Sequence, residues 1–180
     1  MGLEGLLEKH KRTIVNKWFD LVARTYPPDT AQFLKRQKDP FANPVGRTTF
    51  KGLEGMYDQL MGKMDDEAIV PFLDPIIRIR AVQSFTPSKA AGFVFSLKSI
   101  VRETVGGQLR EKEELKELAA LDERIDRIGL LAFDIYMRCR EQVYRLKANE
   151  IRNRVFSAFH RAGLVADTPE DGPETNKTIE

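Results

Sequence analysis

Cysteine, long apolar runs and secretion signals are scarce or absent in this sequence. Its 180 residues contain a single cysteine, Cys139, which excludes an internal disulfide and a cysteine-built zinc site. No apolar stretch approaches the roughly 18 residues that a membrane-spanning helix needs. The first residues also lack the basic start and apolar block of a secretory signal. We therefore expect a cytoplasmic protein with no membrane insertion.

The motifs of common catalytic and nucleotide-binding sites are missing as well. The sequence has no HExxH, GxSxG, GxGxxG or CxxC, and Gly62-Lys63 lacks the flanking residues of a phosphate-binding P-loop. Carboxylates are plentiful, but those between Glu111 and Asp122 are typical of the solvated start of a helix. We predict no catalytic residues, no metal site and no cofactor, and hence a protein that is not an enzyme.

Charge is divided unevenly along the chain. The sequence carries a net +2, from 29 Lys and Arg against 27 Asp and Glu. Residues 165–180 hold five acidic side chains against Lys177 alone, a net −4, which leaves +6 on the rest. This acidic end has few large apolar side chains to bury. We predict one domain over residues 1–162 and a disordered acidic tail over residues 163–180.

Apolar residues recur at helical spacing, whereas the sustained period-two alternation of strands is not found. This spacing predicts an all-α fold. Phe33 and Leu34 are expected to face inward from a short helix. The main helices before residue 110 are expected over residues 3–26, 30–38, 43–61 and 93–105.

Capping side chains stand directly before proline at Asp39-Pro40, Asn43-Pro44, Asp74-Pro75 and Thr86-Pro87. The oxygen of a capping side chain accepts a hydrogen bond from the first helical turn. Proline at the first helical position has no N–H to leave unpaired. We predict that Asn43 begins a helix and that Asp39 shapes the turn before it.

Residues 66–84 are expected to form two short helices joined at Asp74, because Pro71 and Pro75 each remove a helical hydrogen bond. Arg78 and Arg80 alternate with isoleucines in this stretch, so at least one arginine must flank a buried face. We expect its guanidinium to pair with a carboxylate or with backbone carbonyls. An anion site is the alternative.

The last segment is unusually long, with no proline in residues 111–161 and apolar residues in steps of three or four. A helix over residues 113–161 would reach on the order of 70 Å, about twice the width of a domain of this size. We predict that its distal part packs on a second copy of the chain. A break near Ala148-Asn149 with fold-back onto the same domain is the alternative. The predicted interface consists of Cys139, Val143, Leu146, Ile151, Val155 and Phe159.

The two histidines are His10, on the apolar stripe of the first helix, and His160, near the end of the last. A hydrogen-bonded histidine at the core or its boundary is the favoured interpretation of His10, and a cation near a helix C-terminus suits the helix dipole. If the protein held haem, His10 or His160 would have to serve as its ligand. Basic residues between Arg138 and Arg161 alternate with apolar ones and accompany no nucleic-acid motif, so no nucleic-acid partner is expected.

Three stretches resemble the N-terminal domain of the RsbR/RsbRD co-antagonist family, the stressosome-type sensors: KWFDLVARTYPPDTAQFL, KDPFANPVGRT and DPIIRIRAVQSFTPSKAAGFVFSLKSIVRE. The resemblance implies a globin-like fold that usually binds no haem, dimerisation, and a C-terminal linker helix that passes a signal to an attached domain. In the family that domain is commonly a STAS domain with phosphorylatable Thr or Ser. Here only the acidic tail follows the helix, so a stand-alone input module is expected.

We therefore expect an all-α, globin-like helical domain with a long C-terminal helix, with a plain up-down helix bundle as the alternative. The expected function is that of a sensory or protein-interaction domain in stress-response-like signalling, which works by helix packing and dimerisation. The expected partners are a second copy of the chain and an unidentified signalling protein. A haem- or small-ligand-binding globin-type sensor is the alternative function. A globin's proximal histidine would be expected within residues 66–84, which contain no histidine.

Overall fold

The computed structural model describes residues 2–36, 39, 41–62, 64–83, 85–109 and 111–164. These ranges contain helices and no strand, which confirms the predicted all-α class and the long C-terminal helix. The elements are α1 (Leu3–Arg24), α2 (Pro28–Arg36), α3 (Pro44–Met61), α4 (Asp66–Val82), α5 (Pro87–Ala91), α6 (Ser96–Val105), the 3₁₀ helix η1 (Gly106–Gln108) and α7 (Lys112–Arg161).

Internal contacts divide the chain after Glu141 into two compact units. Unit 1 spans residues 1–141 and contains α1 to α6 with the first part of α7. Unit 2 spans residues 142–180 and contains the remainder of α7. The domain boundary at residue 162 and the acidic tail stay predictions, since residues 165–180 lie outside the described part of the chain.

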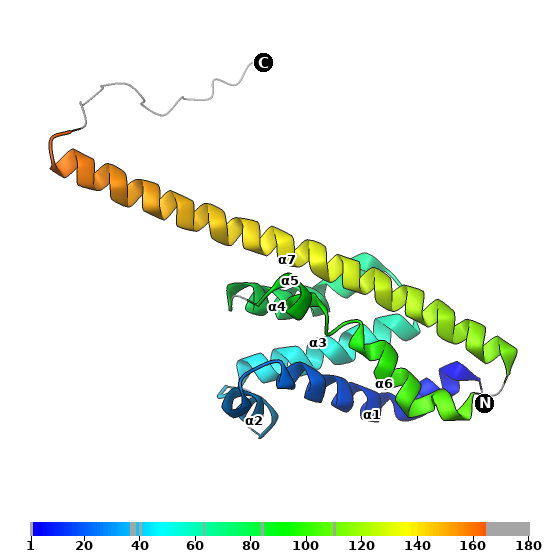
Figure 1. Cartoon of the computed structure of the whole chain (residues 1–180). Helices are drawn as coiled ribbons and strands as arrows, with labels where there is room; N and C mark the ends of the chain where they lie inside the picture. The colour runs from blue at the N-terminus through cyan, green and yellow to red at the C-terminus, as the bar shows by residue number, and fades with distance from the viewer. Residues whose placement is uncertain are drawn as a thin grey trace, which may run out of the picture. The chain divides into compact units, whose positions relative to one another are not determined.

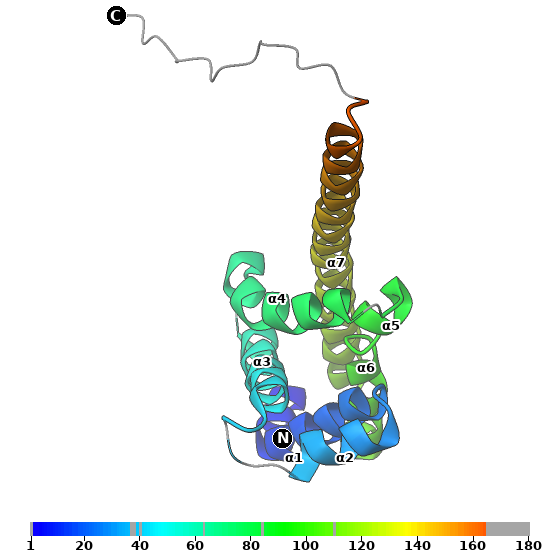
Figure 2. The ribbon, with the colours of Figure 1, turned by 90° about the vertical axis from the view of Figure 1, so that its left-hand side faces the viewer.

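The core of unit 1 forms where α1 packs against α3 and α6 and where α3 packs against α4 (Figures 1 and 2). The stripe predicted on α1 is buried and includes Ile14, Trp18 and Val22. The first part of α7 adds a buried stripe of its own, from Leu118 to Tyr136. Segments far apart in the sequence therefore share one hydrophobic core.

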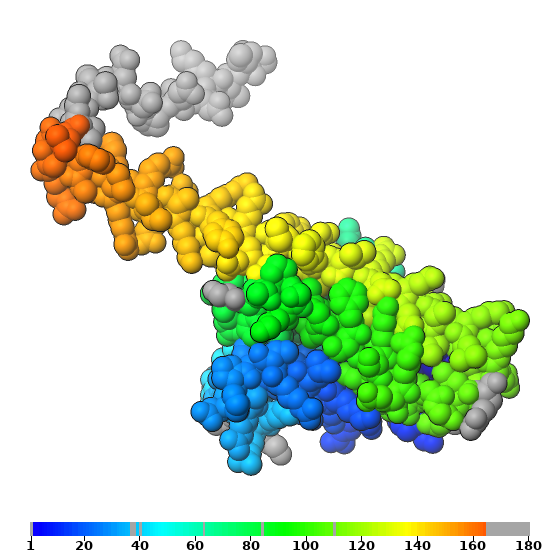
Figure 3. Space-filling model, in the orientation of Figure 1, coloured from blue at the N-terminus to red at the C-terminus, as the bar shows by residue number. Residues whose placement is uncertain are grey.

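In the space-filling view, α6 and the first part of α7 lie side by side on one face of unit 1 (Figure 3). Lys98 Nζ lies 2.6 Å from Asp126 Oδ1, and Arg102 pairs with Asp122. Partly exposed ion pairs contribute little to stability, so these two mainly fix how the helices align. The globin-like arrangement of the helices stays a prediction from the family resemblance.

Asn43 caps α3, as its place before Pro44 predicts. Its Oδ1 accepts a hydrogen bond from the N–H of Gly46 at 2.9 Å. Its Nδ2 donates to the carbonyl of Leu34 at 2.9 Å, so one side chain joins α2 to α3. Asp39 accepts from the N–H of Phe41 at 3.0 Å and shapes the preceding turn. Both predictions are confirmed.

α4 is one helix, so the predicted break at Asp74 is wrong. Asp65 caps the helix instead, while Asp74 pairs with Arg78 one turn later at 2.6 Å. Each internal proline removes one helical hydrogen bond, but Pro71 is exposed, so water can solvate the freed carbonyl near it. Burial of one whole side of the helix offsets the loss. The buried residues are Ile69, Leu73, Ile76, Ile77, Arg80 and Ala81.

α2 begins at Pro28 and ends at Arg36, close to the predicted helix. Leu34 is buried as predicted, whereas Phe33 is 48% exposed and its predicted inward placement is wrong. Adjacent residues of a helix point about 100° apart. A helix of only 9 residues that packs along one narrow side therefore buries Leu34 and leaves Phe33 outside.

Two glycines of α3 let α4 approach closely. A Cβ added to Gly52 would lie 2.6 Å from the carbonyl oxygen of Phe72, and one added to Gly55 would lie 2.3 Å from the Phe72 ring. In the sequence both glycines weaken the helical pattern, since glycine costs about 1 kcal/mol in a helix. In the structure they permit a close approach between the two helices.

We expect Gly52→Ala to lower the free energy of unfolding by about 1–3 kcal/mol, because the added methyl group must displace backbone atoms. Gly107→Ala is the matched control, because nothing lies within 4 Å of a Cβ at that position. Urea unfolding followed by circular dichroism compares the two variants. Equal effects at the two positions would contradict the close approach of α3 and α4.

α7 continues without interruption through Ala148 and Asn149. The predicted helix is confirmed, and the break required by the fold-back alternative is not found in this described stretch. The helix ends at Arg161, and two residues later Gly163 has a φ of 67°, which suits glycine. There the N–H of Leu164 donates to the carbonyl of Phe159 at 3.0 Å, and the N–H of Gly163 donates to that of His160 at 3.1 Å.

Candidate functional site

A buried arginine lies at the centre of an aromatic cage in unit 1. Arg80, in the last turn of α4, has 0% of its surface exposed. Its Cζ lies 4.6 Å from the ring centre of Phe85, 5.2 Å from that of Phe93 and 5.6 Å from that of Tyr26. Cations over aromatic faces at such distances are attracted to the rings. These four residues are called the Arg80 cage below.

The guanidinium of Arg80 has few hydrogen-bond partners. Nη2 donates to Oγ1 of Thr25, while Nε and Nη1 have no hydrogen-bond partner among the described residues. Burial lowers the pKa of Arg80, and the nearby Tyr26 acts in the opposite direction. Burial also raises the pKa of Tyr26, partly offset by the charge on Arg80. Because arginine stays protonated in proteins, the cage holds a permanent positive charge.

The sequence prediction for this stretch is partly right. Arg80 does flank a buried face, whereas Arg78 is exposed and pairs with Asp74. The predicted partner of the buried arginine is wrong, because the guanidinium meets a hydroxyl and aromatic rings, not a carboxylate or carbonyl.

The aromatic members of the cage were missed from the sequence. Tyr26 stands next to Pro27, Phe85 follows α4, and Phe93 lies between α5 and α6, so no local pattern links them. The available signal is that two of the stretches that carry the family resemblance, residues 17–34 and 74–103, contain all four cage residues.

The Arg80 cage is connected to α7 within unit 1. The hydroxyl of Tyr136 donates a hydrogen bond to the carbonyl of Phe85, and Nη1 of Arg140 donates to the carbonyl of Ala81 at 3.0 Å. Phe93 is fixed from the other side, since Trp18 Nε1 donates to its carbonyl at 2.7 Å. A displacement of the cage would therefore act directly on two residues of α7.

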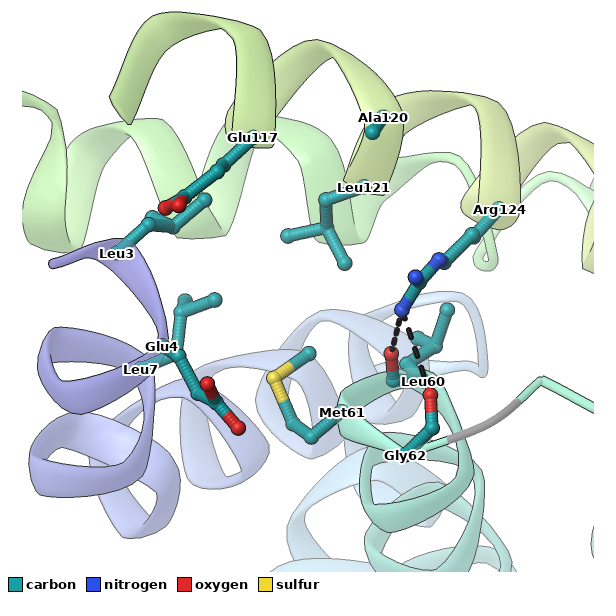
Figure 4. Close-up of a pocket in the computed structure, with 10 residues that line it drawn as sticks. All are labelled: Leu3, Glu4, Leu7, Leu60, Met61, Gly62, Glu117, Ala120, Leu121 and Arg124. Atoms are coloured by element: carbon teal, nitrogen blue, oxygen red, sulfur yellow. Dashed lines mark hydrogen bonds between the residues drawn. The ribbon is translucent and has the colours of Figure 1, made fainter. Parts of the chain in front are cut away.

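A separate cavity of about 290 Å³ lies between α1, the end of α3 and the first part of α7 (Figure 4). Glu4 and Glu117 line it, and Arg124 projects into it from α7. Arg124 Nη1 donates to the carbonyls of Leu60 and Gly62 at 3.0 and 3.4 Å. The arginine thus satisfies carbonyls that the end of α3 leaves free, and the cavity is small beside typical ligand sites.

The six residues of the predicted interface divide between two faces of α7. Each helical residue turns by about 100°, so the five-residue step from Leu146 to Ile151 moves about 140° around the helix. Apolar residues chosen in steps of three, four and five therefore do not stay on one face of the helix. The first face bears Cys139, Val143 and Leu146, and the second bears Ile151, Val155 and Phe159.

The second face, called the 151–159 face below, consists of Ile151, Val155 and Phe159. Their exposed fractions are 62%, 47% and 48%. Together with Ala148, Arg152 and Phe156 they line a shallow apolar groove on unit 2. Exposed apolar surface gathered on one side of a helix is typical of an interaction surface.

The part of α7 in unit 1 also exposes apolar side chains, Leu130, Phe133 and Met137. In the sequence, Leu130, Met137, Tyr144 and Ile151 are each seven residues apart. A seven-residue repeat of apolar residues is typical of the seam between paired helices. This repeat was missed from the sequence, because the buried stripe of the same helix gives the stronger pattern.

Cys139 differs from the other predicted interface residues in its surroundings. It belongs to the core of unit 1 and is 7% exposed. Burial is the main cause that raises the pKa of its thiol; Asp74 adds to this effect, and Arg78 and Arg138 oppose it. A thiol with a raised pKa holds little thiolate at neutral pH, so Cys139 is expected to be unreactive.

His10 is half-buried in α1, as predicted, but its Nε2 is buried and has no hydrogen-bond partner among the residues that the structure describes. His160 lies in the exposed last turn of α7, where its ring stands 6.4 Å from that of Phe156. The two histidines belong to different units.

Within the described ranges, no three His, Cys, Asp or Glu side chains are grouped so that they can hold a metal ion. Among the same residues, none of the helices combines the length and apolarity needed to cross a bilayer.

Comparison with known proteins identifies a family to which the chain is similar. The family model described as the RsbT co-antagonist protein rsbRD N-terminal domain matches residues 12–151. No curated protein and no solved structure matches the chain. The matched range includes the whole Arg80 cage and the start of the 151–159 face.

Proposed function

Because the chain belongs to the RsbT co-antagonist protein rsbRD N-terminal domain family, we propose that it is a non-enzymatic sensory and protein-interaction domain of stress-response signalling. It works through helix packing and dimerisation in the cytoplasm. The family supports the signalling role. The single observation that supports the mode of action is the exposed apolar 151–159 face of α7.

A second copy of the chain is the occupant that we propose for this face. Ile151, Val155 and Phe159 would be buried against the same residues of the partner, as in the symmetric dimers that are commonest among soluble proteins. Burying an aliphatic side chain contributes about 1.5–3 kcal/mol. Several such residues from each copy outweigh the loss of freedom on association.

Charge at the rim of the seam suggests the chemistry of a further partner. Residues 142–164 carry five basic side chains and one acidic, a net +4. Arg152 and Arg154 are exposed beside the apolar residues. We propose that an acidic surface of a signalling protein docks along this rim, attracted by complementary charge.

Sedimentation equilibrium of the intact protein tests the dimer. A single species of twice the chain mass is expected at micromolar concentration, with dissociation on dilution. A monomer throughout this range would refute the proposed mode of action, since the 151–159 face would then have no second copy to bind.

Haem binding is the second candidate function, and the unpartnered Nε2 of His10 is the observation that favours it. Leu7 and Ile14, one turn away on either side, are buried in the packed core at 2% and 0% exposure. A planar macrocycle at His10 would have to displace these side chains.

We therefore expect added haemin to give no stoichiometric histidine-ligated absorption band in the Soret region. The titration is repeated with His10→Ala and His160→Ala. A band at one haem per chain that only one of these variants removes would identify the ligand and establish a haem sensor in place of the proposed function.

A further inference from the structure

The guanidinium of Arg80 carries a full charge that no acidic side chain balances among the residues that the structure describes. It is completely buried, and its one hydrogen bond goes to the neutral hydroxyl of Thr25. In the part of the chain that the structure describes, Nε and Nη1 have no hydrogen-bond partner. Buried charges in proteins are normally paired with an opposite charge and fully hydrogen-bonded. Arg80 therefore lacks an anion.

The aromatic rings do not replace that anion. They interact with the cation through their faces, whereas the five N–H groups of arginine point outward in the plane of the guanidinium. Nε and Nη1 together carry three of those five N–H groups. The Arg80 cage thus stabilises the charge while the N–H groups of Nε and Nη1 keep no acceptor among the described residues.

The ligand class follows from charge and space. A single positive charge inside a shell of three aromatic rings calls for one negative charge with little bulk, and arginine matches carboxylates and other small acceptors. We propose that Arg80 binds a small monovalent anion, of the size of chloride, formate or acetate, on the unpaired edges of its guanidinium.

Such an anion would be the signal that unit 1 senses, and this step rests on the proposed function. Binding at Arg80 would reposition Phe85, whose carbonyl accepts from Tyr136 of α7. Arg140 of α7 contacts the same end of α4 through the carbonyl of Ala81. If α7 has two positions, the anion can shift the equilibrium between them only by the difference in its affinity for the two states.

Trp18 provides a built-in probe, because it is the only tryptophan of the sequence and its ring centre lies 6.2 Å from that of Phe93. Its fluorescence is followed while sodium formate, acetate or chloride replaces sodium gluconate at constant ionic strength. A saturable change with at least one small anion is expected. Formate or acetate alone would identify a carboxylate ligand, and chloride alone a halide.

Arg80→Gln is expected to weaken the response at least tenfold, while the exposed Arg78→Gln serves as matched control. If Arg80→Gln does not fold, nuclear magnetic resonance of the unmodified protein is the substitute test. Binding should then broaden the chloride-35 and carbon-13 formate resonances, and the competing anion should reverse this broadening. No saturable response and no broadening, or equal responses in the two variants, would overturn the proposal. Repeating the titration with a dimer-breaking variant separates this result from the dimer, since anion binding needs unit 1 alone.

Discussion

Replacing Ile151 and Val155 together by glutamate is expected to convert the dimer to a monomer and to raise its dissociation constant about a hundredfold or more. In a symmetric dimer the double change removes four apolar side chains, each worth about 1.5–3 kcal/mol when buried. It also places four carboxylates, two from each copy, in a seam where burial penalises charge. Sedimentation equilibrium over a concentration series measures the effect.

The matched control adds the same charge on another side of the helix. Asn149→Glu with Asn153→Glu has the same four-residue spacing, but each residue lies about 160° from its counterpart. This variant should remain a dimer. Leu146→Glu separates the two faces of the predicted interface, since Leu146 lies on the side of Cys139 and Val143. A loss of dimer in Leu146→Glu and not in the 151/155 variant would place the seam on the first face.

Trp18→Ala is expected to lower the free energy of unfolding by about 3–5 kcal/mol, among the largest effects of any single substitution. Trp18 is fully buried, and its Nε1 donates to the carbonyl of Phe93 at 2.7 Å. The change would leave a cavity between α1 and α6 and an unsatisfied carbonyl beside the Arg80 cage.

Urea unfolding followed by far-ultraviolet circular dichroism measures this loss, because the fluorescent residue is gone. Phe41→Ala is the control, since Phe41 is 94% exposed and should change stability by less than about 0.5 kcal/mol. A Trp18→Ala variant as stable as the control would mean that the packing of α1 on α6 is not as described.

The starts of helices and their buried apolar stripes could be predicted from the sequence because they depend on residues that are close along the chain. Asn43 before Pro44 caps α3 through Gly46, three residues away, and both partners can be read from one short segment. The same local reasoning failed for Asp74 and Pro75. There the burial of a whole side of α4 outweighs two lost hydrogen bonds, and burial depends on helices that no local pattern specifies.

The Arg80 cage and the α3–α4 contact show what local patterns leave out. No spacing or local pattern in the sequence links Phe85 and Phe93 to Tyr26. The close packing of α4 on Gly52 is not visible in the sequence either, where this glycine only lowers the helix propensity of α3. On α7 the six residues of the predicted interface are spread over two faces of the helix. A pattern that allows a five-residue step includes residues from two faces that lie about 140° apart.

Hydroxyl-radical footprinting across the dissociation range most directly tests whether a second copy covers the 151–159 face. Raising the protein concentration should protect Ile151, Val155 and Phe159 from oxidation while Leu146 stays reactive. Oxidation of these three residues that does not change with concentration, or protection of Leu146 in their place, would contradict a dimer seam on this face.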